Sequence, residues 1–233
     1  MQSRCTSSGA GRSLLEGISL WSTKEETKLE TELIHGELKP LNKRHIDLAT
    51  TTKFNYQTGK YNGKTVQIAN YYDKHNKLVA QKLRYPDKSF QWLGDSKQAT
   101  LFGQNLWRDT NKKIVILEGE IDSMSMAQAQ GLKWACVSVK TGSQGAKKDL
   151  QQQLEWLEQA SEIVLMFDSD EAGLKAAWRA LQISLKNVFD DRTVRFLFLP
   201  EGYDPDSFVK EKGNKEFYKK LERAMVLESF TFK

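Results

Sequence analysis

Three apolar runs in the second half of the chain set the strongest limit on what it can fold into. They lie at 114–117, 163–167 and 194–199, and only the last contains a charged residue. A strand with apolar side chains on both faces needs cover on both sides, as the strands of parallel sheets have. Segments with helical patterns at 121–130, 149–159 and 171–188, and a further strand at 134–139, alternate with these runs. This alternation predicts an α/β domain with a mainly parallel sheet flanked by helices.

The preceding stretch has a different rhythm, in which apolar and polar residues alternate. The alternation at 65–71 and 78–85, around a polar turn at 73–77, predicts an antiparallel hairpin with basic side chains on one face. A short helix is predicted at 40–47. The chain is therefore predicted to divide into a flexible tail or linker at 1–30, a small basic α+β subdomain at 31–109, the parallel-sheet domain at 110–200, and a C-terminal acidic motif and helix at 201–233 that complete it.

The positive charge of the chain is concentrated in one segment. Residues 31–109 carry 13 Lys and Arg against 7 Asp and Glu, whereas residues 110–233 carry 18 against 19. Such a segmental excess indicates a polyanionic partner, and a solvated lysine-rich surface explains it equally well. The 233 residues are 39% hydrophobic, and no apolar run approaches the ~18 to 20 residues of a membrane span, so we expect a soluble protein without membrane contact.

Acidic residues follow each of the three apolar runs. The carboxyl ends of parallel strands meet at one edge of the sheet, where such sheets bind ligands. The acids at these positions are Glu118, Glu120, Asp122, Asp168, Asp170, Asp204 and Asp206. Glu-x-Glu and Asp-x-Asp are expected to place two carboxylates on the same side of an extended backbone.

Such a cluster of carboxylates points to bound cations. Ionised carboxylates repel one another unless a cation neutralises them, and Mg²⁺ or Mn²⁺ prefer oxygen ligands. Helix capping explains Asp122 or Asp170 taken alone, since acids are favoured at helix N-termini. Capping does not demand an acidic pair after each strand, so a metal site is the better explanation of the whole set.

Motifs in both halves of the chain resemble one protein family. EGEID at 118–122 and DSD at 168–170 resemble the paired glutamate and DxD motifs of the Toprim domain, which primases, topoisomerases, some nucleases and recombination factors share. DPDS at 204–207 resembles the further acidic motif of bacterial-type primases. The segments 66–71, 81–84 and 101–107 resemble the basic half that precedes Toprim in bacteriophage and mitochondrial-type primase-helicases.

The resemblance implies a DNA primase core, a DNA-directed RNA polymerase that makes short RNA primers on single-stranded DNA from ribonucleoside triphosphates by two-metal nucleotidyl transfer. It implies Glu118, Asp168 and Asp170 as catalytic metal ligands, with Asp122 and Asp204 as further ligands in supporting or second-metal roles. Two ions, Mg²⁺ or Mn²⁺, would serve the reaction. Lys82 and Lys88 match catalytic basic positions, and the candidates for nucleotide or nucleic-acid contact are Lys82, Arg84, Lys88 and Lys140.

The sequence departs from complete primases of this group in its cysteines. Such primases carry a four-cysteine zinc module that reads the template, and Cys5 and Cys136 cannot build one, so no zinc is expected in this chain. A separate zinc-binding module and a replicative helicase are therefore expected partners. The few cysteines also suit a reducing compartment, and we expect the cytoplasm, that of the host cell for a bacteriophage protein, rather than a mitochondrion.

Two other functions fit the same residues. A Toprim-type metal-dependent nuclease would use the same carboxylates, and cleavage of DNA without added nucleotides would identify it. A nucleic-acid-binding accessory protein with a vestigial site is less favoured, because every acidic residue of the motifs is present.

Overall fold

A computed structural model describes most of the chain between residues 32 and 226. The described ranges are 32–107, 113–142, 145–167, 193–197, 199–200, 202–223 and 225–226. The predicted tail at 1–30 and the predicted helix at 171–188 lie outside these ranges, as do Asp168 and Asp170.

The first half of the described chain is built around an antiparallel sheet of strands β1–β5 in sequential order. Its elements are β1 (Glu37–Leu38), the 3-10 helix η1 (Asn42–Arg44), α1 (Leu48–Lys53), β2 (Gln57–Tyr61), β3 (Lys64–Tyr72), β4 (Leu78–Arg84), β5 (Phe90–Gly94) and the 3-10 helix η2 (Gln104–Leu106). The predicted hairpin is confirmed as β3 and β4, which pair antiparallel. The pairing sets Lys82 opposite Trp92 and Arg84 opposite Phe90 on β5, so these four side chains share one face of the sheet.

The second half forms a five-stranded sheet in the order β10-β9-β8-β6-β7. Strands β6 to β9 are parallel and only β10, at the edge, is antiparallel. Its elements are β6 (Lys113–Leu117), α2 (Glu120–Ala129), β7 (Ala135–Ser138), α3 (Ala146–Gln151), α4 (Leu154–Leu157), β8 (Glu162–Met166), β9 (Thr193–Phe196), α6 (Pro205–Glu222) and β10 (Met225–Val226). This arrangement confirms the predicted fold class.

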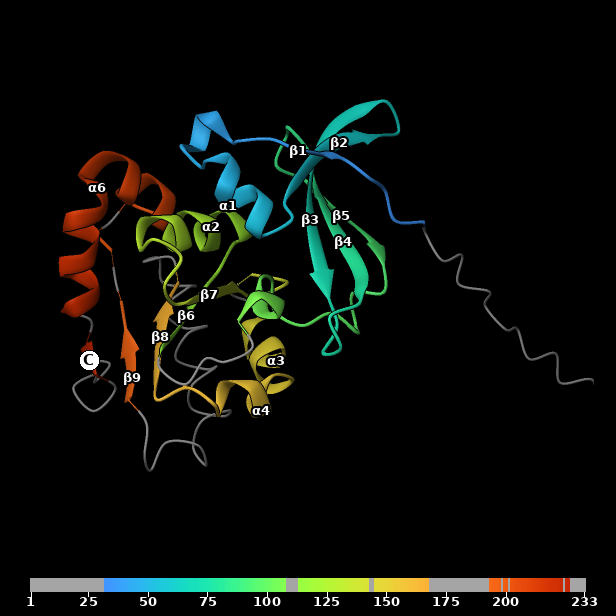
Figure 1. Ribbon diagram of the computed structural model, residues 1–233. Helices are drawn as coiled ribbons and strands as arrows, with labels where there is room; N and C mark the ends of the chain where they lie inside the picture. The colour runs from blue at the N-terminus through green and yellow to red at the C-terminus, as the bar shows by residue number, and fades with distance from the viewer. Residues whose placement is uncertain are drawn as a thin grey trace, which may run out of the picture.

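Two apolar cores explain why strand β6 is apolar at every position from Ile114 to Leu117. Val115 and Leu117 pack into a cluster with residues of α2 and α6, whereas Ile114 and Ile116 pack with residues of α3 and α4. Figure 1 shows α2 and α6 on one side of the second sheet and α3 and α4 on the other. Alternate side chains of β6 therefore enter opposite cores, so both sets must be apolar.

Two predicted helices differ from the structure. The segment predicted as a helix at 40–47 forms only the three-residue η1, because His45 adopts a left-handed conformation (φ 55°) and ends it. Asp47 then caps the separate helix α1 by accepting from the Thr50 N–H at 2.7 Å. The helix predicted at 149–159 is broken into α3 and α4 at Gln153, whose side chain accepts a hydrogen bond from Gln104 of η2.

Among the described residues, no helix combines the length and the apolarity needed to cross a lipid bilayer.

Cys136 on β7 offers a probe of folding. The thiol is fully buried and accepts a hydrogen bond from Gln130 Nε2 at 3.3 Å, and burial raises its pKa to about 12. In a Cys5→Ser background we expect iodoacetamide at pH 8 to leave the folded protein unmodified, because the thiolate is the reactive form. Mass spectrometry should show alkylation of Cys136 only once urea unfolds the chain; alkylation of the folded protein at the rate of a free thiol would contradict this assignment.

Candidate active site

A pocket of about 340 Å³ lies where the two sheets meet, and we call it the carboxylate pocket. Glu118 follows the carboxyl end of β6, and Asp122 lies in the first turn of α2. The residues of its wall that bear on chemistry are Lys82, Arg84, Phe90, Glu118, Glu120 and Asp122. The second sheet thus supplies the acids and the first sheet supplies the bases.

Glu118 and Glu120 both line this pocket, and Gly119 between them has the extended backbone that the Glu-x-Glu prediction assumed (φ −123°, ψ 157°). Strand β6 ends at Leu117, Gly119 is the N-cap of α2, and Glu120 is the first helical residue. The helix turns Glu120 inward, where its Oε1 accepts hydrogen bonds from the Tyr71 hydroxyl at 2.5 Å and from Lys82 Nζ at 2.7 Å. Burial and then the nearby Glu120 carboxylate raise the pKa of Tyr71 well above its ordinary value, so Tyr71 remains a hydrogen-bond donor.

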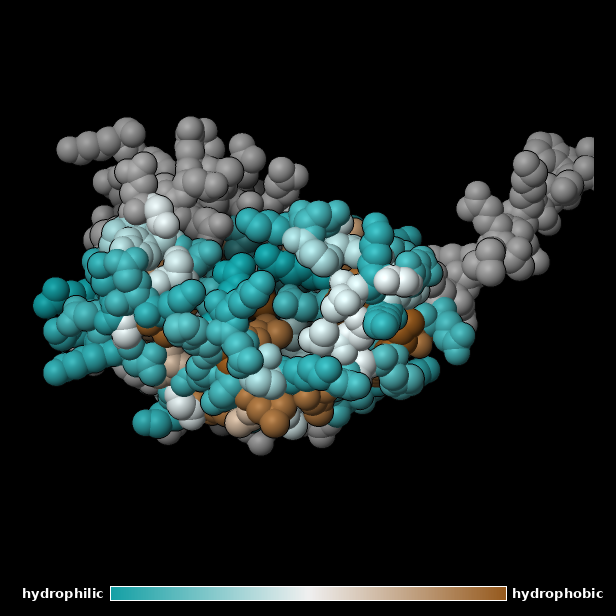
Figure 2. Space-filling model, turned by 90° about the horizontal axis from the view of Figure 1, so that it is seen from above, coloured by the Kyte–Doolittle hydropathy of each residue, from teal (hydrophilic) through white to brown (hydrophobic). Residues whose placement is uncertain are grey.

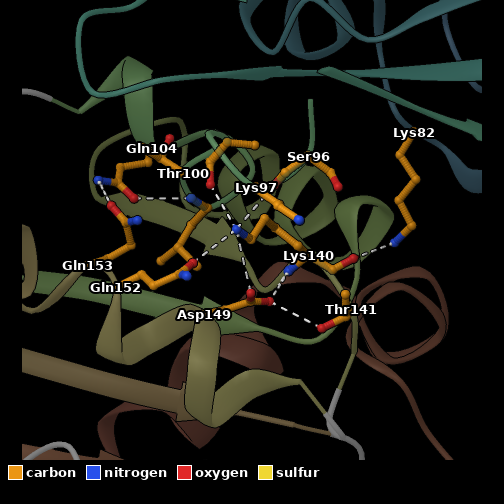
Figure 3. Close-up of polar contacts among 12 residues, drawn as sticks. Lys82, Ser96, Lys97, Thr100, Gln104, Lys140, Thr141, Asp149, Gln152 and Gln153 are labelled. Atoms are coloured by element: carbon orange, nitrogen blue, oxygen red, sulfur yellow. Dashed lines mark hydrogen bonds and ion pairs between the residues drawn. The ribbon is translucent and has the colours of Figure 1, made fainter. Parts of the chain in front are cut away.

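Lys82 links the two sheets. From β4, its ammonium donates to Glu120 at 2.7 Å. It also donates to the backbone carbonyl of Lys140, which follows β7, at 3.0 Å (Figure 3). The side chain is only 11% exposed, and its Nζ lies 4.6 Å from the centre of the Phe90 ring. The predicted catalytic Lys82 therefore does lie in the carboxylate pocket.

Glu118 lies against the loop that follows β7. A Cβ atom placed on Gly142 would come within 3.3 Å of Glu118 Oε1, and Gly142 has a φ of +69°. Both facts favour glycine, because a side chain here would crowd the carboxylate and strain the backbone. The close approach of this loop helps to fix where the Glu118 carboxylate lies.

A second pocket, of about 430 Å³, adjoins the carboxylate pocket and is called here the basic groove. Four cationic residues line it and no acidic residue does; they are Lys43, Arg44, Arg84 and Lys88. Lys88 is thus placed in the groove, in the turn between β4 and β5. Figure 2 shows a face on which hydrophilic side chains predominate and apolar ones gather in small patches. Four of the basic residues of the segment 31–109 therefore lie in the basic groove, next to the pocket that holds Glu118, Glu120 and Asp122.

The two acids of the DPDS motif lie at the start of α6. Asp204 caps the helix by accepting from the Ser207 N–H at 2.6 Å, and it is not among the residues that line the carboxylate pocket. Asp206 is 3% exposed and bonds Arg44 Nη1 at 2.6 Å and the Ser125 hydroxyl at 2.8 Å. The motif thus joins η1, α2 and α6, a structural role that its sequence did not indicate.

Lys140 is placed differently from the other basic candidates. Its ammonium is buried against the Ala99 carbonyl at 2.8 Å and Asp149 Oδ1 at 3.6 Å. The part of this residue that meets the other site residues is its backbone carbonyl, which holds Lys82.

The described residues contain only part of the predicted metal site. Within the described ranges, no three His, Cys, Asp or Glu side chains come together closely enough to hold a metal ion. Glu118 and Asp122 line the same pocket, while the predicted ligands Asp168 and Asp170 lie outside the described residues.

Comparisons with known proteins agree with this two-part site. Residues 36–94 match the family described as the N-terminal α+β fold of the bacteriophage T7 DNA helicase/primase, and residues 115–209 match a Toprim-like family. A DNA helicase/primase of enterobacteria phage T3 is 38% identical over 149 residues, which are 64% of this chain and 26% of that protein. The chain therefore spans about a quarter of the length of that curated relative.

This chain covers a larger share of two solved structures. The crystal structure of the primase fragment of the bacteriophage T7 primase-helicase is 34% identical, with a TM-score of 0.74, and the match covers 83% of this chain and 80% of that one. In a T7 complex, a lagging-strand DNA polymerase interacts with primase domains bound to an RNA/DNA hybrid; the match, also 34% identical with a TM-score of 0.74, covers 82% and 94%. The chain belongs to the family of Toprim primase cores found in bacteriophage primase-helicases.

Proposed function

We propose that the chain is the RNA-polymerase core of a primase, which joins ribonucleotides into short RNA primers on single-stranded DNA. The observation that carries the proposal is that the carboxylates of one pocket face basic side chains across it and adjoin the basic groove. The carboxylate pocket and the basic groove share Arg84 and Ile121 in their walls. Nucleotide joining needs both surfaces, because phosphates are held by cations and the carboxylates can hold metal ions.

The donor set of the carboxylate pocket fits the metal that a Toprim site implies. Glu118 and Asp122 offer carboxylate oxygens, and among the described residues no cysteine or histidine lines the pocket. Oxygen-only sites suit Mg²⁺ or Mn²⁺. We propose that Glu118 and Asp122 hold two such ions together with Asp168 and Asp170, with Asp204 in a supporting role. When bound, the ions would neutralise phosphate charge and lower the pKa of the attacking 3'-hydroxyl.

The basic residues would hold the remaining phosphate charge. Lys82 and Arg84 lie two residues apart on β4, and Lys88 follows in the next turn. Charge-assisted contacts from these side chains would bind the triphosphate of the incoming nucleotide, and Lys43 and Arg44 would bind the backbone of the template and primer.

Phe90 would supply a surface for a base. Its side chain is 50% exposed at the rim of the carboxylate pocket, with Lys82 Nζ 4.6 Å and the Arg84 guanidinium 5.7 Å from the ring centre. Trp92 instead packs against Tyr71, with ring centres 4.8 Å apart. An exposed ring beside phosphate-binding groups suits stacking with a nucleobase.

The partners of the whole protein follow from its relatives. The T3 relative is named a helicase/primase, and the T7 primase domains were seen with an RNA/DNA hybrid. We propose that the chain works with a replicative helicase and with a zinc-binding module, on this protein or another, in the cytoplasm of the host cell.

One assay separates this function from the nuclease alternative. The first reaction holds single-stranded DNA templates, labelled ribonucleoside triphosphates and Mg²⁺, and it is run both with and without a partner zinc module. We expect short RNA products whose synthesis requires the template and the metal. A parallel reaction holds labelled DNA and Mg²⁺ but no nucleotides, and we expect intact DNA. Robust cleavage there, with no RNA product in the first reaction, would reject the primase assignment.

A further inference from the structure

Lys140 is a buried cation that the proposed reaction does not use. It follows β7 and is 6% exposed, yet its ammonium lies among groups from two parts of the fold (Figure 3). It donates to the Ala99 carbonyl at 2.8 Å and to Gln152 Oε1 at 3.3 Å, and it lies 3.6 Å from Asp149 Oδ1. Burying a lysine is costly unless its partners compensate, so this placement calls for a reason.

Asp149 contacts Lys140 through both of its carboxylate oxygens. Its Oδ2 accepts the Lys140 backbone N–H at 2.8 Å, while its Oδ1 faces the Lys140 ammonium. Asp149 is itself 4% exposed and lies on α3, which packs in the core of the second sheet. The hydroxyl of the next residue, Thr141, also donates to Asp149 Oδ2 at 3.4 Å. Asp149 thus holds the chain on both sides of the Lys140 carbonyl, which restricts the direction of that carbonyl.

That carbonyl holds Lys82. Lys82 Nζ donates to the Lys140 oxygen at 3.0 Å and pairs with Glu120 at 2.7 Å. The Lys140 ammonium also holds the segment that follows β5, by donating to the Ala99 carbonyl at 2.8 Å and to the Ser96 carbonyl at 3.5 Å. Residue 140 therefore makes three hydrogen bonds to the first half of the chain. A flexible lysine such as Lys82 loses rotamer entropy when it is ordered, and two fixed acceptors remove much of that freedom in advance.

We infer that Lys140 is a positioning residue, which with Asp149 orients Lys82 for contact with the nucleotide phosphates. The inference rests on the proposed function for what Lys82 contacts, but not for where Lys82 is held. It also departs from the sequence-based expectation that Lys140 binds a nucleotide directly.

The first test reads the position of Lys82 without any reaction. The pair Lys140→Met with Asp149→Asn removes both buried charges and keeps similar volumes, and Lys133→Met, exposed before β7, is the matched control. In the full chain we expect acetylation of Lys82 by an N-hydroxysuccinimide ester, followed by mass spectrometry, to rise several-fold in the pair and not in the control. Unchanged protection of Lys82 would overturn the inference.

The second test asks whether Lys140 acts through Lys82. In primer synthesis we expect the pair to lower kcat about tenfold with the nucleotide KM nearly unchanged, and to add almost no loss in a Lys82→Met background. An equal loss in both backgrounds would show support of the fold alone. If the unaltered chain makes no RNA, the proposed function fails while the acetylation result still decides the role of Lys140. Should the methionine pair not fold, Lys140→Gln with Asp149→Asn keeps a donor for the Ala99 carbonyl and carries both tests.

Discussion

Replacing Glu118 with glutamine is expected to lower RNA synthesis about 10³-fold while the protein stays folded and still binds DNA, because the substitution removes a metal-binding charge and little volume. Glu118 follows β6, lines the carboxylate pocket and lies against Gly142, so no other described acid occupies its place. The basic groove, which should carry the affinity for DNA, is untouched. Initial rates of dinucleotide formation over a Mg²⁺ titration measure the effect, and we expect the variant to need more Mg²⁺ for its remaining activity.

The control for this experiment is Glu158→Gln, which removes an exposed acid after α4 on the other side of the sheet. It should match the unaltered protein in rate and in Mg²⁺ dependence. DNA binding is followed by fluorescence anisotropy at a fixed salt concentration, since phosphate contacts depend strongly on salt. A Glu118→Gln rate within threefold of the unaltered rate would mean that this carboxylate holds no catalytic ion.

The parallel sheet could be predicted because local sequence carries its constraint. Each of the runs at 114–117 and 163–167 is apolar at every position, and the two cores on either side of the sheet require that. The place of Glu118 and Asp122 could be predicted for the same reason, since strand order alone brings carboxyl ends to one edge. Because both residues are acids, the sequence also indicated a site for divalent cations.

Contacts between distant residues could not be predicted in this way. Lys82 and Glu120 are 38 positions apart, and they meet only because the first sheet and the start of α2 line the same pocket. The Glu-x-Glu spacing likewise placed Glu120 in one pocket with Glu118, but it did not indicate that Glu120 pairs with Tyr71 and Lys82. The spacing of residues along the sequence predicts which side chains lie on the same face of one strand or helix. It does not predict how the first sheet packs against the second.

The DPDS motif also makes contacts that the sequence did not predict. Its acids were recognised, but the sequence did not indicate that Asp204 caps α6. The partner of Asp206 is Arg44, 162 positions earlier in the chain. No local pattern connects these residues, so their ion pair became visible only with the fold.

Removing Arg44 should therefore destabilise the protein strongly, even without any nucleic acid present. Asp206 is 3% exposed, and in an Arg44→Met variant its carboxylate would lose its cationic partner and keep the hydrogen bond from the Ser125 hydroxyl. Breaking a buried pair so that one charge stays uncompensated costs about 3–5 kcal/mol of unfolding free energy. Asp206→Asn should cost less, about 1–2 kcal/mol, because the Arg44 side chain left behind is 36% exposed and can be hydrated.

Urea unfolding followed by tryptophan fluorescence measures this asymmetry, with Lys39→Met as the control. Lys39 also forms an ion pair, with Glu37 at 2.5 Å, but both side chains are more than half exposed, so its removal should leave the urea midpoint unchanged. The order of destabilisation expected is Arg44→Met, then Asp206→Asn, then Lys39→Met. If Asp206→Asn proved the more harmful of the first two, the free energy would lie in contacts of the aspartate other than Arg44. The ion pair would then not be what joins η1 to α2 and α6.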